Sequence, residues 1–166
     1  MNYDPAVYRV VFFSSAPIGV PFLHALAADK RYDLVGVVTM PDAASGRGLH
    51  MQENIIKQEA KQYVDEKNIQ TPTRLHPEKS DIGKEFSQRL QALEADYIVV
   101  IAYGKIIPQP ILDIPKVYPI NVHGSLLPLY RGASPIQSVF LDRRKQSGIT
   151  IMEMVAELDA GPMIDK

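Results

Sequence analysis

Two polar residues near the middle of the C-terminal half have types and spacing that suit catalysis. Asn121 and His123 directly follow the strand-like run VYPI, in the segment NVHGSLLPLYRGASP. A third polar residue, Asp159, lies in the segment ELDAG. If the strand before Asp159 lies beside the strand that ends at Ile120, the carboxylate can reach the imidazole. The sequence therefore offers an amide, an imidazole and a carboxylate to one site.

These three side chains suit acyl transfer to an amine. A free α-amine titrates near pH ~8 and is itself the nucleophile, so a serine or cysteine is not required. The amide of Asn121 or a protonated imidazole can donate a hydrogen bond to a developing oxyanion. His123 can also move protons near neutral pH, and the carboxylate of Asp159 would fix its tautomer.

Each of these residues alone is more typical of ordinary structure. An Asn-x-His pair after a strand usually satisfies its own hydrogen bonds in a turn, and an aspartate before Ala-Gly is usually a turn residue. The SLLP segment would ordinarily be a core contact, Arg131 a solvated loop residue, and His24 a helix-face or core histidine. Spacing alone therefore leaves both interpretations open.

Composition sets limits on the class of protein. The chain has 166 residues, of which 46% are hydrophobic and 22% charged, which indicates one globular domain with a sheet-based core. A formal net charge of −1 gives no bulk attraction to nucleic acid, although it leaves room for a local basic patch. No apolar run is long enough for a membrane span, and the N-terminal segment MNYDPAVYRVVFF carries acid rather than base. We expect a cytoplasmic protein without a membrane partner.

Several common kinds of site are absent from the sequence. There are no cysteines, which excludes disulfides and thiolate chemistry, and the four histidines are far apart, so we expect no metal. The first strand–helix turn reads FFSSAPIG, with one glycine where a dinucleotide loop requires G-x-G-x-x-G. A G-x-x-x-x-G-K-[ST] phosphate loop is also missing.

The hydrophobic pattern predicts an open, mostly parallel α/β sheet. Residues 8–13, 32–40 and 96–103 are rich in apolar, β-branched and aromatic side chains, which is typical of strands buried on both faces. Helical spacing of apolar residues predicts a helix after the first strand and further helices over residues 51–67 and 78–94. This alternation of strands and helices indicates parallel βαβ units.

The remaining segments complete this prediction. NIQTPTRLHP is typical of a short edge strand or an extended connection. SPIQSVFLDRRKQ is expected to be a helix, and GITIMEMVAELDAG a last strand and loop. Ligands of such sheets bind outside the carboxyl ends of the strands. We expect five loops to leave from that edge: residues 14–19, 40–50, 103–110, 121–132 and 157–162.

Several segments together resemble the methionyl-tRNA formyltransferase family. In chain order they are VVFFSSAPIGVPFLHAL, VVTMPDAASGRGL, DYIVVIAYGKIIPQPILDIP, NVHGSLLPLYRGASPIQ and GITIMEMVAELDAGPMI. The resemblance implies a Rossmann-like formyltransferase fold with helices on both faces of the sheet. It also implies transfer of a formyl group from 10-formyltetrahydrofolate to the α-amine of methionyl initiator tRNA, without a metal.

The resemblance also implies roles for individual residues. Asn121, His123 and Asp159 match the catalytic residues of the family, and Arg47 matches a segment that the family uses near the acceptor end of tRNA. The expected folate-site residues are Ser125, Leu126, Leu127 and Pro128 of SLLP, with Tyr103 and Gly104 of AYGKIIP. The pair Leu126–Leu127 is expected to help wall the pterin.

The resemblance leaves the scope of the activity open. Residues 1–166 are expected to be the N-terminal formyltransferase domain, incomplete at its C-terminal end and without the C-terminal β-barrel domain of the family. The alternatives are a sugar or glycinamide-ribonucleotide formyltransferase, a formyltetrahydrofolate hydrolase, and a non-catalytic folate- or RNA-binding remnant. The sequence does not report an oligomeric state.

Overall fold

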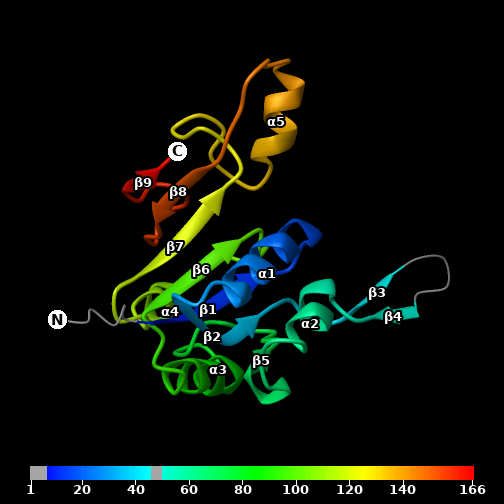
Figure 1. Cartoon of the computed structure of the whole chain (residues 1–166), viewed down its shortest axis with the longest axis vertical. Coiled ribbons are helices and arrows are strands. Elements are labelled where there is room, and N and C mark those ends of the chain that lie inside the picture. Colours follow the sequence, from blue (N-terminus) through cyan, green and yellow to red (C-terminus); the bar gives the residue numbers. More distant parts are fainter. Residues whose placement is uncertain (1–6, 46–49) are drawn as a thin grey trace.

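A seven-stranded sheet forms the centre of the molecule (Figure 1). The computed structural model describes residues 7–45 and 50–166. The sheet order is β5-β2-β1-β6-β7-β8-β9, and its strands are β1 (Tyr8–Ser14), β2 (Tyr32–Val38), β5 (Ile69–Gln70), β6 (Tyr97–Ile101), β7 (Tyr118–His123), β8 (Thr150–Glu153) and β9 (Met163–Asp165). The first five strands in this order pair in parallel, whereas β8 and β9 are antiparallel to their neighbours. The prediction of an open, mostly parallel α/β sheet is confirmed.

Helices cover the sheet on both faces. The α-helices are α1 (Val20–Ala28), α2 (Ile55–Ala60), α3 (Asp81–Gln91), α4 (Gln109–Leu112) and α5 (Pro135–Leu141), and the 3₁₀ helices are η1 (Pro17–Gly19) and η2 (Glu66–Asn68). No helix among the described residues has the length and apolar character that a membrane crossing requires.

Strand β1 supplies side chains to the core on both faces of the sheet. Phe13 packs in the cluster that includes Leu90 of α3, whereas Phe12 packs in the cluster that includes Leu23 of α1. Successive side chains of a strand point to opposite faces, so a strand covered on both sides must be apolar throughout. This explains why residues 10–13 are all apolar instead of alternating with polar residues.

The packing beneath α3 predicts a large effect on stability. Leu90 is completely buried in its cluster, so replacing Leu90 with alanine is expected to lower the free energy of unfolding by about 2–5 kcal/mol. Leu141 is 82% exposed, so Leu141→Ala is expected to change it by less than ~0.5 kcal/mol. Urea unfolding of both variants measures the difference. Equal losses would contradict the assignment of this core.

The prediction of one long helix over residues 51–67 is wrong. Residues 50–52 form strand β4 (His50–Gln52), which pairs with β3 (Ala43–Ser45) in a separate two-stranded sheet. Helix α2 begins only after Asn54, whose side chain accepts a hydrogen bond from the Ile56 amide at 2.9 Å and so caps the helix. Met51 is therefore in a hairpin and is 69% exposed instead of packing on a helix face.

The β3–β4 hairpin extends away from the main sheet in Figure 1, and hydrogen bonds between side chains and backbone at the base of the hairpin hold it. Asp42 accepts hydrogen bonds from the Asn54 amide at 3.2 Å and from the Lys57 ammonium group at 2.8 Å. The bond to Lys57 is the main reason why the pKa of Asp42 is lowered. The Asn54 side chain also donates to the Ser15 carbonyl at 3.0 Å. The hairpin is thereby tied to the loop that follows β1.

The antiparallel direction of β8 corrects one expected loop position. His123 pairs with Thr150 and Ile120 pairs with Glu153, so β8 ends near the amino end of β7. The loop that contains Asp159 therefore starts at the edge opposite to the expected one. This loop must return along the sheet for Asp159 to approach His123. Strand β9, which the sequence pattern did not predict, pairs with β8 after the return.

Candidate active site

His123 is the last residue of β7 and its ring is held from two sides. The residue is only 5% exposed. Its Nε2 atom lies 3.0 Å from the carbonyl oxygen of Tyr130. A carbonyl oxygen only accepts hydrogen bonds, so Nε2 carries a proton in this arrangement. Nδ1 then faces the second contact of the ring.

That second contact is Asp159. Its Oδ1 atom lies 3.7 Å from Nδ1 of His123, which is ion-pair range but longer than a hydrogen bond. The side chains of His123 and Asp159 are only 6% and 7% exposed, so both groups are largely shielded from solvent water. Nδ1 can donate toward this carboxylate only when the ring carries protons on both nitrogens. The predicted juxtaposition of the imidazole and the carboxylate is present in the structure.

The loop backbone fixes the position of the carboxylate. Oδ2 of Asp159 accepts a hydrogen bond from the Gly132 amide at 2.7 Å. Asp159 has a φ of 50°, a left-handed conformation that aspartate adopts more readily than most residues. Gly132 also has a positive φ, of 102°, which glycine adopts without strain. The loops after β7 and β8 therefore meet at one carboxylate.

Asn121 lies on the same face of β7 as His123. Side chains two positions apart on a strand point in the same direction. Asn121 is half-buried and pairs with Met152 of β8. Its side-chain amide makes no hydrogen bond to any residue in the ranges 7–45 and 50–166. An amide in this state can donate to a bound substrate.

The SLLP segment holds the loop after β7 in shape. Ser125 is fully buried and its hydroxyl donates to the Leu129 carbonyl at 2.7 Å. Thr150 donates to the Ser125 carbonyl at 2.8 Å and accepts from the Leu127 amide at 3.0 Å. Leu127 is 4% exposed, whereas Leu126 is 39% exposed. The family resemblance assigned this segment to folate, whereas the burial of Ser125 and Leu127 agrees with the alternative of a core contact.

Pro128 and Leu126 are the exposed members of the same segment. Pro128 follows a cis peptide bond from Leu127. Ser125 and Leu127 face the protein interior, so the side chains of this segment that are open to a ligand are those of Leu126 and Pro128. The expectation that all four residues contact folate stays a prediction.

The loop after β6 contains the other two expected folate-site residues. Tyr103 is 2% exposed, and its ring packs edge-on against Phe13 with centroids 5.2 Å apart. Its hydroxyl is buried without a hydrogen-bond partner among the described residues, and this burial raises the pKa of Tyr103. Gly104 has a φ of 86° and open space where a Cβ would stand. The loop therefore exposes backbone at this point.

A cavity of about 410 Å³ lies beside this loop. It is lined by Leu75, His76, Lys105, Ile106 and Pro108. The Lys105 ammonium group donates to the carbonyls of residues 72 and 73 at 3.0 and 3.1 Å, and burial lowers the pKa of Lys105. The cavity thus combines apolar walls with one cation.

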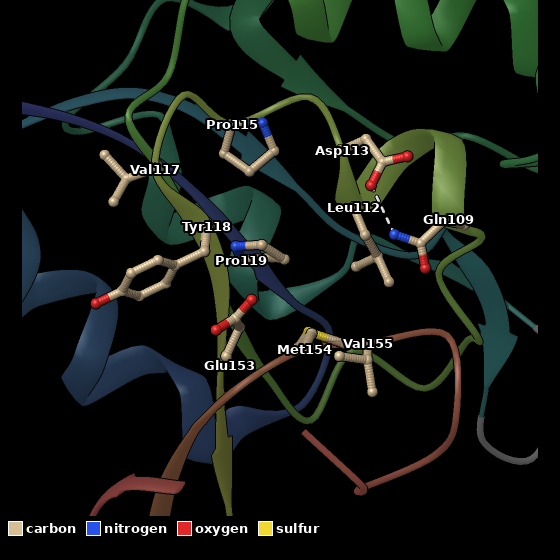
Figure 2. A pocket seen from close by; sticks show the side chains of 10 residues that line it. All are labelled: Gln109, Leu112, Asp113, Pro115, Val117, Tyr118, Pro119, Glu153, Met154 and Val155. Atoms are coloured by element: carbon tan, nitrogen blue, oxygen red, sulfur yellow. Dashed lines mark hydrogen bonds between the residues drawn. The ribbon is translucent and has the colours of Figure 1, made fainter. Parts of the chain in front are cut away.

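A second cavity, of about 270 Å³, lies away from the predicted site residues (Figure 2). Its walls include Tyr118 and Pro119 at the start of β7 and Glu153 at the end of β8. Figure 2 shows Gln109 bonded to Asp113 at one side of it, at 2.6 Å. His123 and Asn121 are at the other end of β7, so this cavity is separate from them.

Two further predicted residues are not part of the assembled group. Arg47 lies outside the described residues, so its predicted contact with tRNA has no structural test here. Arg131 is exposed, as expected for a loop residue. Among the described residues, no group of three or more histidine, aspartate and glutamate side chains is arranged to hold a metal ion.

Gly161 allows the loop that carries Asp159 to pass close to the backbone of β8. A Cβ at this position would lie 1.9 Å from the backbone carbonyl oxygen of Glu153. Replacing Gly161 with alanine is expected to displace the loop that carries Asp159 and to lower the free energy of unfolding by roughly 1–3 kcal/mol. Urea unfolding tests this, with the exposed Ala156→Ser in the same loop as the control. If both variants unfold alike, the close approach is unimportant.

The fold is shared with solved structures of other proteins. A glycinamide ribonucleotide transformylase 1 from Symbiobacterium toebii aligns with 97% of this chain and 72% of its own, with a TM-score of 0.75 and 20% identity. A formyltetrahydrofolate deformylase from Pseudomonas syringae pv. tomato str. DC3000 aligns with 95% of this chain and 49% of its own, with a TM-score of 0.72 and 23% identity. At these identities the similarity defines the class of fold, a Rossmann-like formyltransferase fold.

Sequence comparison narrows the class to a family. The family model described as formyl transferase matches residues 8–166, and the chain belongs to this family. It is 43% identical over 158 residues to a methionyl-tRNA formyltransferase of Bacillus subtilis (strain 168), covering 95% of this chain and 47% of the relative. It is 41% identical over 153 residues to one of Sulfurihydrogenibium sp. (strain YO3AOP1), covering 92% and 47%. The chain thus spans about half the length of the curated relatives it matches.

Proposed function

We propose that residues 1–166 belong to the N-terminal catalytic domain of an enzyme that formylates methionyl initiator tRNA in the cytoplasm. The formyl donor would be 10-formyltetrahydrofolate. Identities of 41–43% to proteins named methionyl-tRNA formyltransferase support this acceptor. The structural neighbours named for glycinamide ribonucleotide are only 18–24% identical, so they support the fold and not the acceptor.

One observation carries the proposal. His123 at the end of β7 lies 3.7 Å from Asp159, and Asn121 lies on the same face of the same strand. His123 and Asp159 are far apart in sequence, and the fold brings the imidazole and the carboxylate together in a buried place. Acyl transfer to an amine requires a hydrogen-bond donor for the carbonyl oxygen and a group that moves protons.

Asn121 would stabilise charge on the formyl oxygen. The folate supplies an activated formyl group, and the amine of the methionyl ester is the nucleophile that attacks its carbon. Negative charge develops on the formyl oxygen as the new C–N bond forms. The half-buried amide of Asn121 can donate a hydrogen bond to that oxygen, and such a donor is worth more where water is excluded.

His123 would move the proton that the attacking nitrogen must lose. Its ring is buried beside the Asp159 carboxylate, which can hold the ring while it carries an extra proton. The proton would pass to the nitrogen that leaves the formyl carbon, so that the numbers of protons balance. Nε2 already donates to the Tyr130 carbonyl, so Nδ1 is the atom that would take and return this proton, while Asp159 would remain a carboxylate beside it.

The loop after β6 has features that fit a folate. A pterin is a flat heterocycle with polar edges, and backbone groups near Gly104 are accessible because no side chain covers them. The adjoining cavity of about 410 Å³ has apolar walls and the Lys105 cation, which suits an aromatic ligand with an anionic part. Tyr103 would support this loop from the core through its contact with Phe13.

The β3–β4 hairpin is the element that we assign to the tRNA acceptor. Arg47 belongs to the segment between its two strands and supplies a cation that can contact phosphate. The ties from Asp42 and Asn54 would hold the base of the hairpin relative to the loop after β1. The donor would thus lie at the loop after β6 of the main sheet, and the acceptor at the separate β3–β4 hairpin.

A discharge assay tests the proposed function. Purified protein is mixed with 10-formyltetrahydrofolate, with and without methionyl initiator tRNA, and both formyl-methionyl-tRNA and free formate are measured. The proposal expects formyl-methionyl-tRNA only when the acceptor is present. Formate release at the same rate with and without tRNA would instead indicate a hydrolase. Transfer to glycinamide ribonucleotide but not to tRNA would overturn the assigned acceptor.

A further inference from the structure

The backbone of Tyr130 holds His123, which raises the question of what holds Tyr130. The Tyr130 carbonyl accepts the hydrogen bond from Nε2 of His123 at 3.0 Å. Tyr130 has a φ of 58°, in the left-handed region. A tyrosine in this region is uncommon and persists only when its surroundings fix it. The carbonyl direction therefore depends on contacts that restrain the residue.

The side chain of Tyr130 provides such contacts. Its hydroxyl donates a hydrogen bond to Oδ2 of Asp142 at 2.8 Å. The same hydroxyl oxygen accepts a hydrogen bond from Nε of Arg144 at 2.9 Å. Both partners follow α5 directly, so the far end of that helix reaches back to the loop after β7. One hydroxyl thus uses its donor and an acceptor position at once.

These contacts form a continuous path to the imidazole. It runs from Asp142 and Arg144 through the hydroxyl and backbone of Tyr130 to Nε2 of His123. On its other side the ring faces Asp159. The hydrogen bond from Ser125 to the Leu129 carbonyl restrains the residue before Tyr130 but does not touch its side chain. The hydrogen bonds of the Tyr130 side chain to described residues are those with Asp142 and Arg144.

We propose that Tyr130 is a positioning residue for His123, and that Asp142 and Arg144 act through it. The Tyr130 hydroxyl, held by these two side chains, keeps its own carbonyl directed at Nε2 and so sets the orientation and the proton position of the imidazole. The importance of Tyr130 for catalysis rests on the proposed function, whereas the effect of Tyr130 on the orientation of the His123 ring does not. Tyr130 itself need not touch the substrate.

The variant Tyr130→Phe removes the hydroxyl and keeps the ring. Nuclear magnetic resonance of protein with ¹⁵N-labelled histidine reports the protons on each ring nitrogen, and comparison with His123→Ala assigns the His123 signals. In Tyr130→Phe we expect a changed Nε2 shift and exchange of the Nε2 proton with water that is at least about tenfold faster, because that proton loses a fixed acceptor. Tyr8→Phe, at the opposite end of the sheet, is the control and should leave these signals unchanged.

Changes at Asp142 test the same path from its other end. Asp142→Asn keeps an oxygen that can accept from the Tyr130 hydroxyl, so His123 signals close to those of the unaltered protein are expected. Asp142→Ala removes the acceptor and should shift them in the direction seen for Tyr130→Phe. Unchanged His123 signals in both Tyr130→Phe and Asp142→Ala would overturn the proposal. Shifts spread through the methyl groups of the core would also overturn it, since they would indicate a general role in folding.

Kinetics give the second readout. In Tyr130→Phe, kcat for formyl transfer is expected to fall about tenfold, with KM for the folate changed less than about twofold, since only the ring orientation is altered. A rise in KM with an unchanged kcat would contradict positioning. The resonance experiment requires no turnover, so a failure of the proposed function would leave that test intact.

Discussion

Replacing His123 with alanine is expected to lower formyl transfer by about 10²–10⁴-fold, the range found for loss of a general acid–base group. The ring is buried between the Tyr130 carbonyl and Asp159, and the substitution removes the ring while leaving both neighbours in place. Folate binding is expected to change little, because the loop of Tyr103 and Gly104 is a separate segment. The measurement is single-turnover transfer from 10-formyltetrahydrofolate to methionyl-tRNA, with folate binding followed by fluorescence.

His24→Ala is a matched control for this substitution. His24 is exposed on α1 and lies 3.0 Å from Glu59, away from β7. It should keep full transfer activity. Full activity in His123→Ala would rule out the proposed role of the imidazole, whereas loss of folate binding together with transfer would assign His123 to binding.

The second large effect is expected from Asp159→Asn. The amide has nearly the same shape, its oxygen can still accept from the Gly132 amide, and asparagine tolerates the φ of 50°. What disappears is the negative charge 3.7 Å from Nδ1 of His123. Without that charge the protonated ring is less stable, so the rate of transfer should fall by about 10²-fold or more at neutral pH.

Stability separates this effect from simple unfolding. Asp159→Asn should unfold at nearly the same urea concentration as the unaltered protein, because the contact with Gly132 is kept. Asp113→Asn, in the separate cavity of Figure 2, is the charge-matched control and should retain activity. An active Asp159→Asn would show that the carboxylate is dispensable.

Much of the sheet could be predicted because its strands are buried on both faces. Residues 10–13 and 97–103 form unbroken apolar runs. Strand β1 includes the first run, and β6 lies within the second. The approach of Asp159 to His123 was also predictable, given that the last predicted strand lay beside β7. For the strands a strong local pattern determined the outcome, whereas Asp159 reaches His123 through a loop that starts at the edge opposite to the expected one.

Other features depend on contacts that no local pattern reveals. Residues 51–67 have helical spacing, but pairing of β4 with β3 and the cap at Asn54 delay the helix to residue 55. The direction of β8 follows from its pairing with β7, and the sequence of Thr150–Glu153 suits either direction. The role of Tyr130 acts through its backbone carbonyl, which is the same in every residue type. A positive φ at a tyrosine leaves no mark in the sequence.

The central claim is that the formyl group reacts beside Asn121 and His123. A crystal structure of the protein with a non-transferring analogue of 10-formyltetrahydrofolate tests it most directly. The account predicts the formyl group of the analogue within hydrogen-bond distance of the Asn121 amide and the His123 ring, with the pterin against the loop that contains Gly104. An analogue bound with its formyl group away from β7, for example wholly within the cavity lined by Tyr118 and Glu153, would contradict it.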